Sequence, residues 1–422
     1  MYITGIICEY NPFHNGHAWQ IAEIRRRNPD TAIVALLSGA FCQRGSAALL
    51  DKWTRARLAV TQGCDLVLEL PFVFACRSAQ AFATGGVQLL ASLGLEGQLA
   101  FGAETDDLAT LQQAAAHLAS PALQTALRAR LAQGAAYAAA LADSLQVATG
   151  LAPALLRQPN NILALEYLRA LQTQPCLAPL LLPRHSANHH DCALHQHYAS
   201  GTAIRQALYC ATAEPDWPAL ASAVPPATLT ALQNAVTTGL PDANRLLPAL
   251  QTALLSQSSA ALYRIYGLSA GEGILPRLRS AATAAVSLDD FIHRAATRHY
   301  TAARLRRLVP YLLLGLTTET IQTLTANGPA YVHVLAINTR GQAVLHAAKQ
   351  SAAIPIVTRF SQLLTSQQRD LGLAQLTAAT PQLTQARQQA ALDSLATELR
   401  NLTLPPASHQ QNDFNTSPYV TK

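Results

Sequence analysis

Short apolar runs alternate with helically spaced segments over the first seventy residues of the chain. Residues 3–8, 32–37 and 65–70 are apolar runs of strand length. Between them, residues 15–27 and 52–62 place apolar side chains at helical intervals. Such alternation predicts buried strands joined by helices. Because strand–helix–strand units cross over in a right-handed way, we expect the strands to form a parallel sheet.

The pattern changes after a fourth strand, expected near residues 98–101. Helical spacing then covers residues 107–150, a segment opening at Pro159 and most of residues 207–316. Later runs of strand length lie at residues 180–182, 331–338 and 354–357. The chain is therefore expected to be an α/β protein with a parallel-sheet domain over residues 1–206, a mainly helical region with a small strand-containing piece over 207–404 and a disordered polar tail over 405–422.

Composition narrows the class of protein. Apolar residues make up 50% of the 422 residues, so the chain is expected to bury a large core. No apolar stretch approaches the roughly 18 residues of a membrane helix. The first residues also lack the basic and apolar pattern of a signal peptide. We therefore expect a cytoplasmic protein that does not contact a membrane.

The cationic side chains are almost all arginine. The chain has 30 Lys+Arg against 24 Asp+Glu, and only Lys52, Lys349 and Lys422 are lysines. A guanidinium group binds phosphate through parallel hydrogen bonds and stacks on bases, so this bias is typical of a phosphate-rich partner. A genome-wide preference for arginine codons explains the bias equally well, and both explanations stay open.

Cysteine and histidine residues give no clear metal pattern. The seven cysteines are scattered without a C-x-x-C pair, which indicates reduced thiols. Residues 185–197 contain five histidines and Cys192, a density that could ligate zinc. Their spacing matches no zinc finger or ribbon, and histidine also suits phosphate and RNA contacts. We therefore predict no metal site.

The most informative residues follow the first predicted strand. His14, Asn15, Gly16 and His17 lie where that strand passes into its helix. Ligands of parallel sheets bind at the carboxyl ends of the strands, and a helix start offers unpaired N–H groups to phosphate. The two histidines share one face of the first turn, and Gly16 admits close approach of a nucleotide. We predict that this turn stabilises charge on a phosphorus centre; surface histidines at a helix start are the alternative.

A second phosphate-binding segment is predicted further along the chain. Ser200 and Thr202 precede Arg205, so their hydroxyl groups could cap a helix whose first turn directs the arginine toward the phosphates. The alternative is an ordinary helix cap followed by a solvated arginine.

A longer set of motifs carries a family resemblance. It consists of residues 9–17, 37–45, 51–53, 63–71, 101–102, 159–163, 298–307 and 312–315. In combination these motifs resemble the bacterial tRNA(Met) cytidine acetate ligases, members of the HIGH-type nucleotidyltransferase superfamily. The resemblance implies a Rossmann-like nucleotidyltransferase domain followed by a tRNA-binding helical region. The motifs depart from the family at Ala40, Ser46 and Ala47 and within residues 184–191.

The resemblance also implies an activity and an ATP site. Such enzymes make acetyl-adenylate from acetate and ATP, then acetylate the wobble cytidine in the anticodon loop of elongator tRNA(Met) to N4-acetylcytidine. The implied ATP site consists of Ile7, Cys8, Glu9, Tyr10, Asn11, Pro12, Phe13, His14, Asn15, Gly16, His17, Ala18, Trp19, Gln20, Gly102, Asn161 and Arg184, to which the second segment adds Ser200 and Thr202.

The expected chemistry assigns roles to several of these residues. An acetate oxygen attacks the α-phosphorus and pyrophosphate leaves, with Mg²⁺ held by the phosphates. Charge is expected to be stabilised by His14, His17, Arg184 and Arg205. Asp65, and with it Glu69, could orient the cytosine amine or accept its proton. Equally, the two carboxylates could only cap and support the end of the sheet.

RNA contacts are expected at four arginines in the C-terminal half: Arg298, Arg304, Arg306 and Arg307. On a helix, Arg304 and Arg307 share a face. Only Asp289 and Asp290 are acidic residues close by in sequence, so we expect the patch to be locally unneutralised and to attract phosphate. A solvated helix edge is the alternative.

Three functions stay open at this point. The first is an ATP-dependent RNA acetylase. The second is a small-molecule adenylyltransferase that joins AMP to a phosphorylated acceptor. The third, suggested by Ala40 and Ser46, is a non-catalytic RNA-binding protein with a decayed nucleotide pocket.

Overall fold

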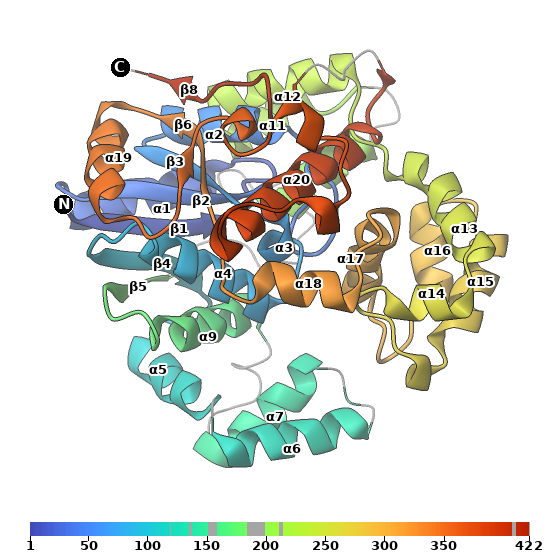
Figure 1. The fold of residues 1–422 in the computed structure, drawn as a ribbon. Coiled ribbons are helices and arrows are strands. Elements are labelled where there is room, and N and C mark those ends of the chain that lie inside the picture. Colours follow the sequence, from blue (N-terminus) through green and yellow to red (C-terminus); the bar gives the residue numbers. More distant parts are fainter. Residues whose placement is uncertain are drawn as a thin grey trace.

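Five parallel strands form the centre of the structure, a computed structural model that describes residues 1–118, 120–133, 135, 137–150, 158–183, 199–210, 214–406 and 411–421 (Figure 1). These strands are β1 (Ile3–Cys8), β2 (Ala32–Ser38), β3 (Leu66–Leu70), β4 (Gly97–Ala103) and β5 (Leu177–Pro183). They lie in the order β5-β4-β1-β2-β3, and all neighbours in this series are parallel. The predicted parallel sheet is confirmed.

Alternate residues of β2 are buried on opposite faces of this sheet. Ile33, Ala35 and Leu37 join an apolar cluster with α1 (Asn15–Arg27) and α2 (Lys52–Thr61). Val34 and Leu36 join a second cluster with α4 (Ala79–Ala91). Successive strand residues point to opposite faces, so an uninterrupted apolar run is what a sheet covered on both sides requires.

Strands late in the chain extend the same sheet. β6 (Val332–Ile337) pairs antiparallel with β3, while β7 (Ile356–Val357) and β8 (Tyr419–Val420) pair parallel with β6. The strand-containing piece expected within residues 207–404 is therefore not a separate unit, because its backbone completes the sheet that the first residues begin. The sheet therefore contains strands from both sides of the boundary expected at residue 206.

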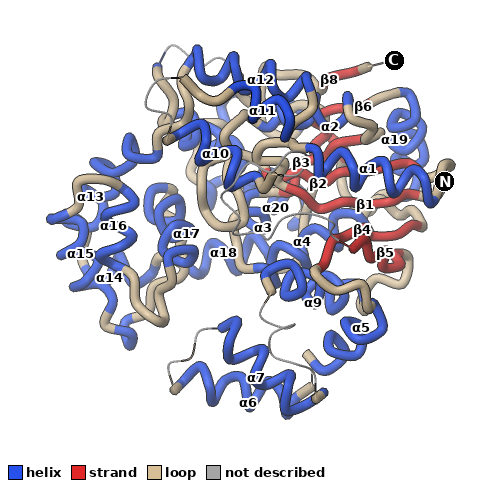
Figure 2. Tube along the Cα trace, turned by 180° about the vertical axis from the view of Figure 1, so that it is seen from behind, coloured by secondary structure: helices blue, strands red, loops and turns tan. Residues whose placement is uncertain are grey.

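Helices from the second half of the chain gather on one side of the sheet (Figures 1 and 2). This group consists of α13 (Leu247–Ser256), α14 (Ser259–Arg264), α15 (Ile274–Ala284), α16 (Leu288–Ala295) and α17 (Ala302–Leu313). The other helices are α3 (Phe72–Ala75), α5 (Leu108–His117), α6 (Pro121–Ala132), α7 (Tyr137–Thr149), α9 (Pro159–Leu171), α10 (Gly201–Tyr209), α11 (Trp217–Ala223), α12 (Pro226–Thr238), α18 (Thr318–Thr325), α19 (Thr339–Ser351) and α20 (Pro381–Asn401). No described helix is long and apolar enough to cross a membrane.

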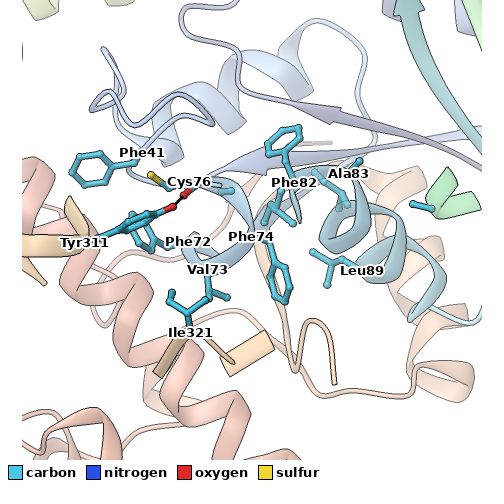
Figure 3. Close-up of a cluster of buried hydrophobic side chains, with 14 of the residues drawn as sticks. Phe41, Phe72, Val73, Phe74, Cys76, Phe82, Ala83, Leu89, Tyr311 and Ile321 are labelled. Atoms are coloured by element: carbon cyan, nitrogen blue, oxygen red, sulfur yellow. Dashed lines mark hydrogen bonds between the residues drawn. The ribbon is translucent and has the colours of Figure 1, made fainter. Parts of the chain in front are cut away.

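The helical group is fixed to the sheet through α17. In Figure 3, Tyr311 lies beside Phe41 and Phe72, and its hydroxyl donates a hydrogen bond to the backbone carbonyl of Cys76. Burial raises the pKa of Tyr311 well above its usual value, so the hydroxyl stays a donor. Because Phe41 follows β2 and Phe72 follows β3, α17 packs against the loops at the carboxyl ends of both strands.

The C-terminal tail is ordered where it is described, so the expectation of disorder is wrong for residues 411–421. Asp413 is buried and forms an ion pair with Lys52 of α2. Its backbone carbonyl accepts a hydrogen bond from Phe360, whose ring packs against Phe414. A polar composition suggested disorder, but here the tail supplies the counter-charge of a buried ammonium group.

Candidate active site

Two histidines stand at the junction between β1 and α1. The Nδ1 atom of His14 accepts a hydrogen bond from the backbone N–H of Gly16 (3.1 Å), and Nδ1 of His17 accepts one from the backbone N–H of His14 (3.2 Å). The two rings stack with centroids 3.7 Å apart. Since both Nδ1 atoms accept, each neutral ring carries its proton on Nε2, an atom that can donate to an anion. Both histidines therefore lie on one side of the turn, and their role toward phosphate stays a prediction.

Gly16 leaves room for this stack. A Cβ atom at Gly16 would lie 3.0 Å from Cε1 and 3.1 Å from Nδ1 of His14. A side chain there would push the His14 ring by a few tenths of an ångström. Close approach of a nucleotide to Gly16 stays a prediction.

Asn11 ties the turn before α1 to the loop that follows β2. Its Oδ1 accepts a hydrogen bond from the backbone N–H of Leu49 (2.8 Å), and its Nδ2 donates to Sγ of Cys42 (3.1 Å). Burial raises the pKa of the Cys42 thiol to about 12, so this sulfur stays protonated. The turn that carries the histidines is therefore held by backbone and side-chain contacts and not by helix capping alone.

The side chains near the start of the predicted ATP site lie in three environments. Cys8, Tyr10 and Phe13 are buried in the apolar cluster beneath α1, so they support the turn. Ile7 packs on the other face of the sheet against Gly86. The first residues of α1 are half-buried: Asn15, Gly16, His17, Ala18, Trp19 and Gln20.

The second predicted segment meets the first. One guanidinium nitrogen of Arg205 donates to the backbone carbonyl of Asn11, and the other donates to Oγ1 of Thr202 (3.1 Å). Oγ of Ser200 caps α10 by accepting from the N–H of Ala203 (3.0 Å). The N-terminus of α10 therefore faces the turn before α1. The helix cap, which both interpretations shared, is present, and Arg205 bonds inward to the turn, whereas its contact with phosphates stays a prediction.

Gly102 and Asn161 lie on the other side of β1. Gly102 is near the carboxyl end of β4. Two residues later, the carboxylate of Glu104 accepts a hydrogen bond from the N–H of Asn161 (2.8 Å). In return, Oδ1 of Asn161 accepts from the N–H of Glu104 (2.9 Å). This reciprocal pair fixes the loop after β4 to the start of α9, at the same edge of the sheet as the histidines.

Sequence reasoning missed Arg55. Its guanidinium is fully buried in α2 and donates to the carbonyls of Glu9 (2.6 Å), Leu50 (3.0 Å) and Gly39. Burial lowers the pKa of Arg55, although nearby acidic groups oppose the shift. The side chain joins the loops after β1 and β2. An arginine among the apolar positions of a predicted helix was the only available signal.

The structure contradicts a catalytic role for Asp65. Its Oδ2 accepts hydrogen bonds from the N–H of Ile33 (2.7 Å) and from Arg25 (2.7 Å), and its Oδ1 accepts from Asn338 (3.0 Å). Asp65 precedes β3, so it lies at the amino edge of the parallel strands, opposite the histidines. The alternative interpretation, a carboxylate that supports the end of the sheet, fits these contacts.

Glu69 is equally unsuited to contact a substrate. Its buried carboxylate binds Nζ of Lys52 (2.7 and 2.8 Å) and Nδ1 of His333 (2.7 Å). Burial raises the pKa of Glu69, but Lys52 and His333 together hold it below its usual value. Glu69, His333 and Asp413 place ligand-type atoms within 4.8 Å of one another. The Lys52 ammonium pairs with both carboxylates of that group and thus supplies the positive charge that a metal ion would bring.

The arginine patch is only partly as expected. Arg304 lies over the Tyr300 ring (3.8 Å) and pairs with Glu272 (3.2 Å), while Arg306 pairs with Asp289 (3.0 Å). These ion pairs show that the expectation of an unneutralised patch is wrong. Glu272 was missed because it lies about thirty residues earlier in the sequence and meets Arg304 only in the fold. Within the described part of the chain, neither Arg298 nor Arg307 has a carboxylate partner. Arg184 and residues 185–197 lie outside the described residues.

Comparison with known proteins agrees with this geometry. Residues 1–414 match the model of the HIGH nucleotidyl transferase family. The chain therefore belongs to this class of nucleotidyl transferases.

The chain belongs to the family of tRNA(Met) cytidine acetate ligases. It is 36% identical to the ligase of Syntrophomonas wolfei, with 99% of each chain covered, and 38% identical to that of Latilactobacillus sakei, with 88% of this chain and 92% of the relative covered. The crystal structure of Thermotoga maritima TmcAL without ligand superimposes with a TM-score of 0.87, 26% identity and coverage of 100% and 99%. The form of that protein bound with α-thio ATP gives a TM-score of 0.86.

Proposed function

We propose that this chain activates acetate with ATP and transfers the acetyl group to the exocyclic amine of the wobble cytidine in elongator tRNA(Met), giving N4-acetylcytidine. The observation that carries the proposal is the stacked pair of His14 and His17 at the N-terminus of α1. The likeness to a relative bound with α-thio ATP and the family membership support it.

In the first step, a carboxylate oxygen of acetate bonds to the α-phosphorus of ATP, and the bond to the bridging oxygen breaks. Pyrophosphate leaves with the electron pair. His14 and His17 donate to the phosphate oxygens on which charge increases, and the N-terminus of α1 adds positive partial charge there. Mg²⁺ enters with ATP as part of the substrate and is held by the phosphates.

In the second step, the cytosine amine attacks the acetyl carbonyl carbon, AMP leaves and the amine loses a proton. Asp65 has no part in this step because it lies at the opposite edge of the sheet. Arg205 holds the turn through Asn11 and adds positive charge beside it. Ser200, Thr202, Gly102, Asn161 and Arg184 complete the proposed nucleotide site.

The helical region is proposed to bind the tRNA. Arg298 and Arg307 are available to phosphates, whereas Arg304 and Arg306 exchange Glu272 and Asp289 for the RNA when it binds. A splayed anticodon-loop base reaches an enzyme pocket at lower cost than a base in a duplex. Since tRNA is the substrate, the reaction takes place in the cytoplasm.

The test uses purified protein, labelled acetate and two transcripts of elongator tRNA(Met) that differ only at the wobble position, cytidine or uridine. Label is expected to enter the cytidine transcript alone, and only with ATP. AMP joined to a small metabolite would instead support an adenylyltransferase. Absence of ATP turnover would leave a non-catalytic RNA-binding protein.

A further inference from the structure

The loop of residues 43–45 contacts both the end of β1, just before the turn that carries the histidines, and the helical region. The backbone N–H of Gln43 donates to Oε1 of Glu9 (2.6 Å), directly after β1. The side chain of Gln43 donates to the carbonyl of Arg77 (2.7 Å), after β3. Gly45 touches the first turns of α17, where an added Cβ would overlap the backbone nitrogen of Arg307. Three segments that are distant in sequence therefore meet at one loop.

Each of the three segments carries an arginine at or next to this meeting: Arg44, Arg77 and Arg307 (the three-arginine cluster). Arg44 is exposed, and the other two are half-buried. Burial raises the pKa of the Cys76 thiol, and both Arg307 and Arg77 oppose that rise, so both guanidinium groups lie within electrostatic reach of one sulfur. Glu9 acts on the same thiol, which places the cluster beside the turn that carries the histidines.

The three-arginine cluster differs from the neighbouring arginines in its charge balance. Arg294, Arg304 and Arg306 each form an ion pair with a carboxylate. Among the described residues, no member of the cluster does so: Arg77 stacks on Tyr266 (4.5 Å) and donates to its hydroxyl (2.9 Å). Even with the Glu9 carboxylate nearby, the three guanidinium groups leave a net positive charge for an external anion.

We propose that the three-arginine cluster binds backbone phosphates of the RNA on either side of the reacting nucleotide. The inference rests on the proposed function, and it adds Arg44 and Arg77 to the RNA surface. Arginine binds phosphate through paired N–H donors, and the cluster extends from the loop beside the turn that carries the histidines to α17, which holds Arg307. RNA held there would present one base to the acetyl-adenylate while the rest of the tRNA extends over the helical group.

The test measures binding of labelled elongator tRNA(Met) between about 50 and 200 mM salt, where each phosphate contact contributes about 0.7 to 0.9 to the slope of log affinity against log salt. Alanine at all three positions is expected to weaken binding and to reduce the slope by about 2. Arg44→Glu alone should reduce affinity, and Arg44→Lys should keep the slope. The matched control is Arg340→Ala, which removes an exposed arginine at the amino edge of the sheet, where its guanidinium binds only backbone carbonyls.

A triple variant with the slope of Arg340→Ala, in protein whose thermal unfolding midpoint is unchanged, would overturn the inference. If the triple variant does not fold, Arg44→Glu decides, because Arg44 is exposed and its loss leaves the described packing intact. Failure of wild-type protein to acetylate tRNA, with the slopes still reduced as expected, would contradict the proposed function and leave the RNA surface in place.

Discussion

The guanidinium of Arg400, near the end of α20, donates hydrogen bonds to the backbone carbonyls of Ala48 (2.9 Å) and Leu49 (3.1 Å). Leu49 in turn donates its N–H to Oδ1 of Asn11, in the turn that carries the two histidines. A helix formed some 350 residues later in the chain therefore holds the turn on which the nucleotide site is built. Arg400 is a positioning residue, because it acts on the site only through the loop.

Replacing Arg400 by methionine tests this connection. Burial lowers the pKa of Arg400 to about 10, so at neutral pH a charged group is removed and two buried carbonyls lose their donor. The free energy of unfolding should fall by about 2 kcal/mol or more, and KM for ATP should rise while the KM for tRNA changes less. Arg387→Met is the matched control. Arg387 also lies on α20 and donates to two backbone carbonyls, those of Leu363 and Thr377, but these are not in the loop of Ala48 and Leu49. An unchanged KM for ATP in Arg400→Met would contradict the positioning role.

The tail is expected to contribute to stability through Asp413. Its removal leaves the Lys52 ammonium buried with one carboxylate partner fewer. Breaking a buried ion pair typically costs about 3 to 5 kcal/mol when the remaining charge has no counter-charge, which is an upper bound here because Glu69 still pairs with Lys52. Asp413→Ala should therefore lower the urea midpoint strongly, whereas Asp370→Ala, at an exposed position, should leave it nearly unchanged. Equal midpoints for the two variants would show that the tail does not stabilise the sheet.

Glu69 gives the stability a definite pH dependence. Its folded-state pKa is lowered from 4.5, so it contributes stability that is present above pH 4.5 and lost as the pH falls through the lower folded-state value. The contribution of Asp413 to stability changes with pH in the opposite direction, since burial raises its pKa above the usual 3.8 although Lys52 lowers it. Comparing denaturation of wild-type and Glu69→Gln protein from neutral pH into acid isolates the first contribution. The difference between them should shrink below pH 4.5, and a difference that grows there would contradict this sign.

Much of the site follows from local sequence, and the rest depends on distant contacts. The strand–turn–helix at His14 was predictable because apolar periodicity and a helix start are local properties. Asp65 was misplaced although it begins the predicted strand of residues 65–70: the first residue of a strand in a parallel sheet lies at the amino edge, away from the carboxyl ends where ligands bind. Glu272, Arg400 and Asp413 were invisible as partners, since each meets its contact across many residues of chain. Their pairing is a property of the packing between the sheet and the later helices.

Gly45 should tolerate no side chain. Its φ of +87° is unfavourable for other residues, and a Cβ atom there would overlap the backbone at Arg306 and Arg307. Gly45→Ala should cost about 1 to 3 kcal/mol of unfolding free energy and weaken tRNA binding, because α17 must move away from the loop. Gly271→Ala, where an added Cβ meets nothing within 4 Å, is the control and should be close to neutral. Similar unfolding midpoints for both variants would contradict close packing at Gly45.

The central claim is that His14 and His17 stabilise charge on the phosphates of ATP. Acetate-dependent exchange of labelled pyrophosphate into ATP measures that step without tRNA. His14→Asn keeps a residue that caps helices well, so α1 should remain intact. We predict that His14→Asn and His17→Asn each reduce exchange by about 10²-fold or more, while His346→Asn, at an exposed position on α19, retains the wild-type rate. Wild-type exchange in either His14→Asn or His17→Asn would contradict the account.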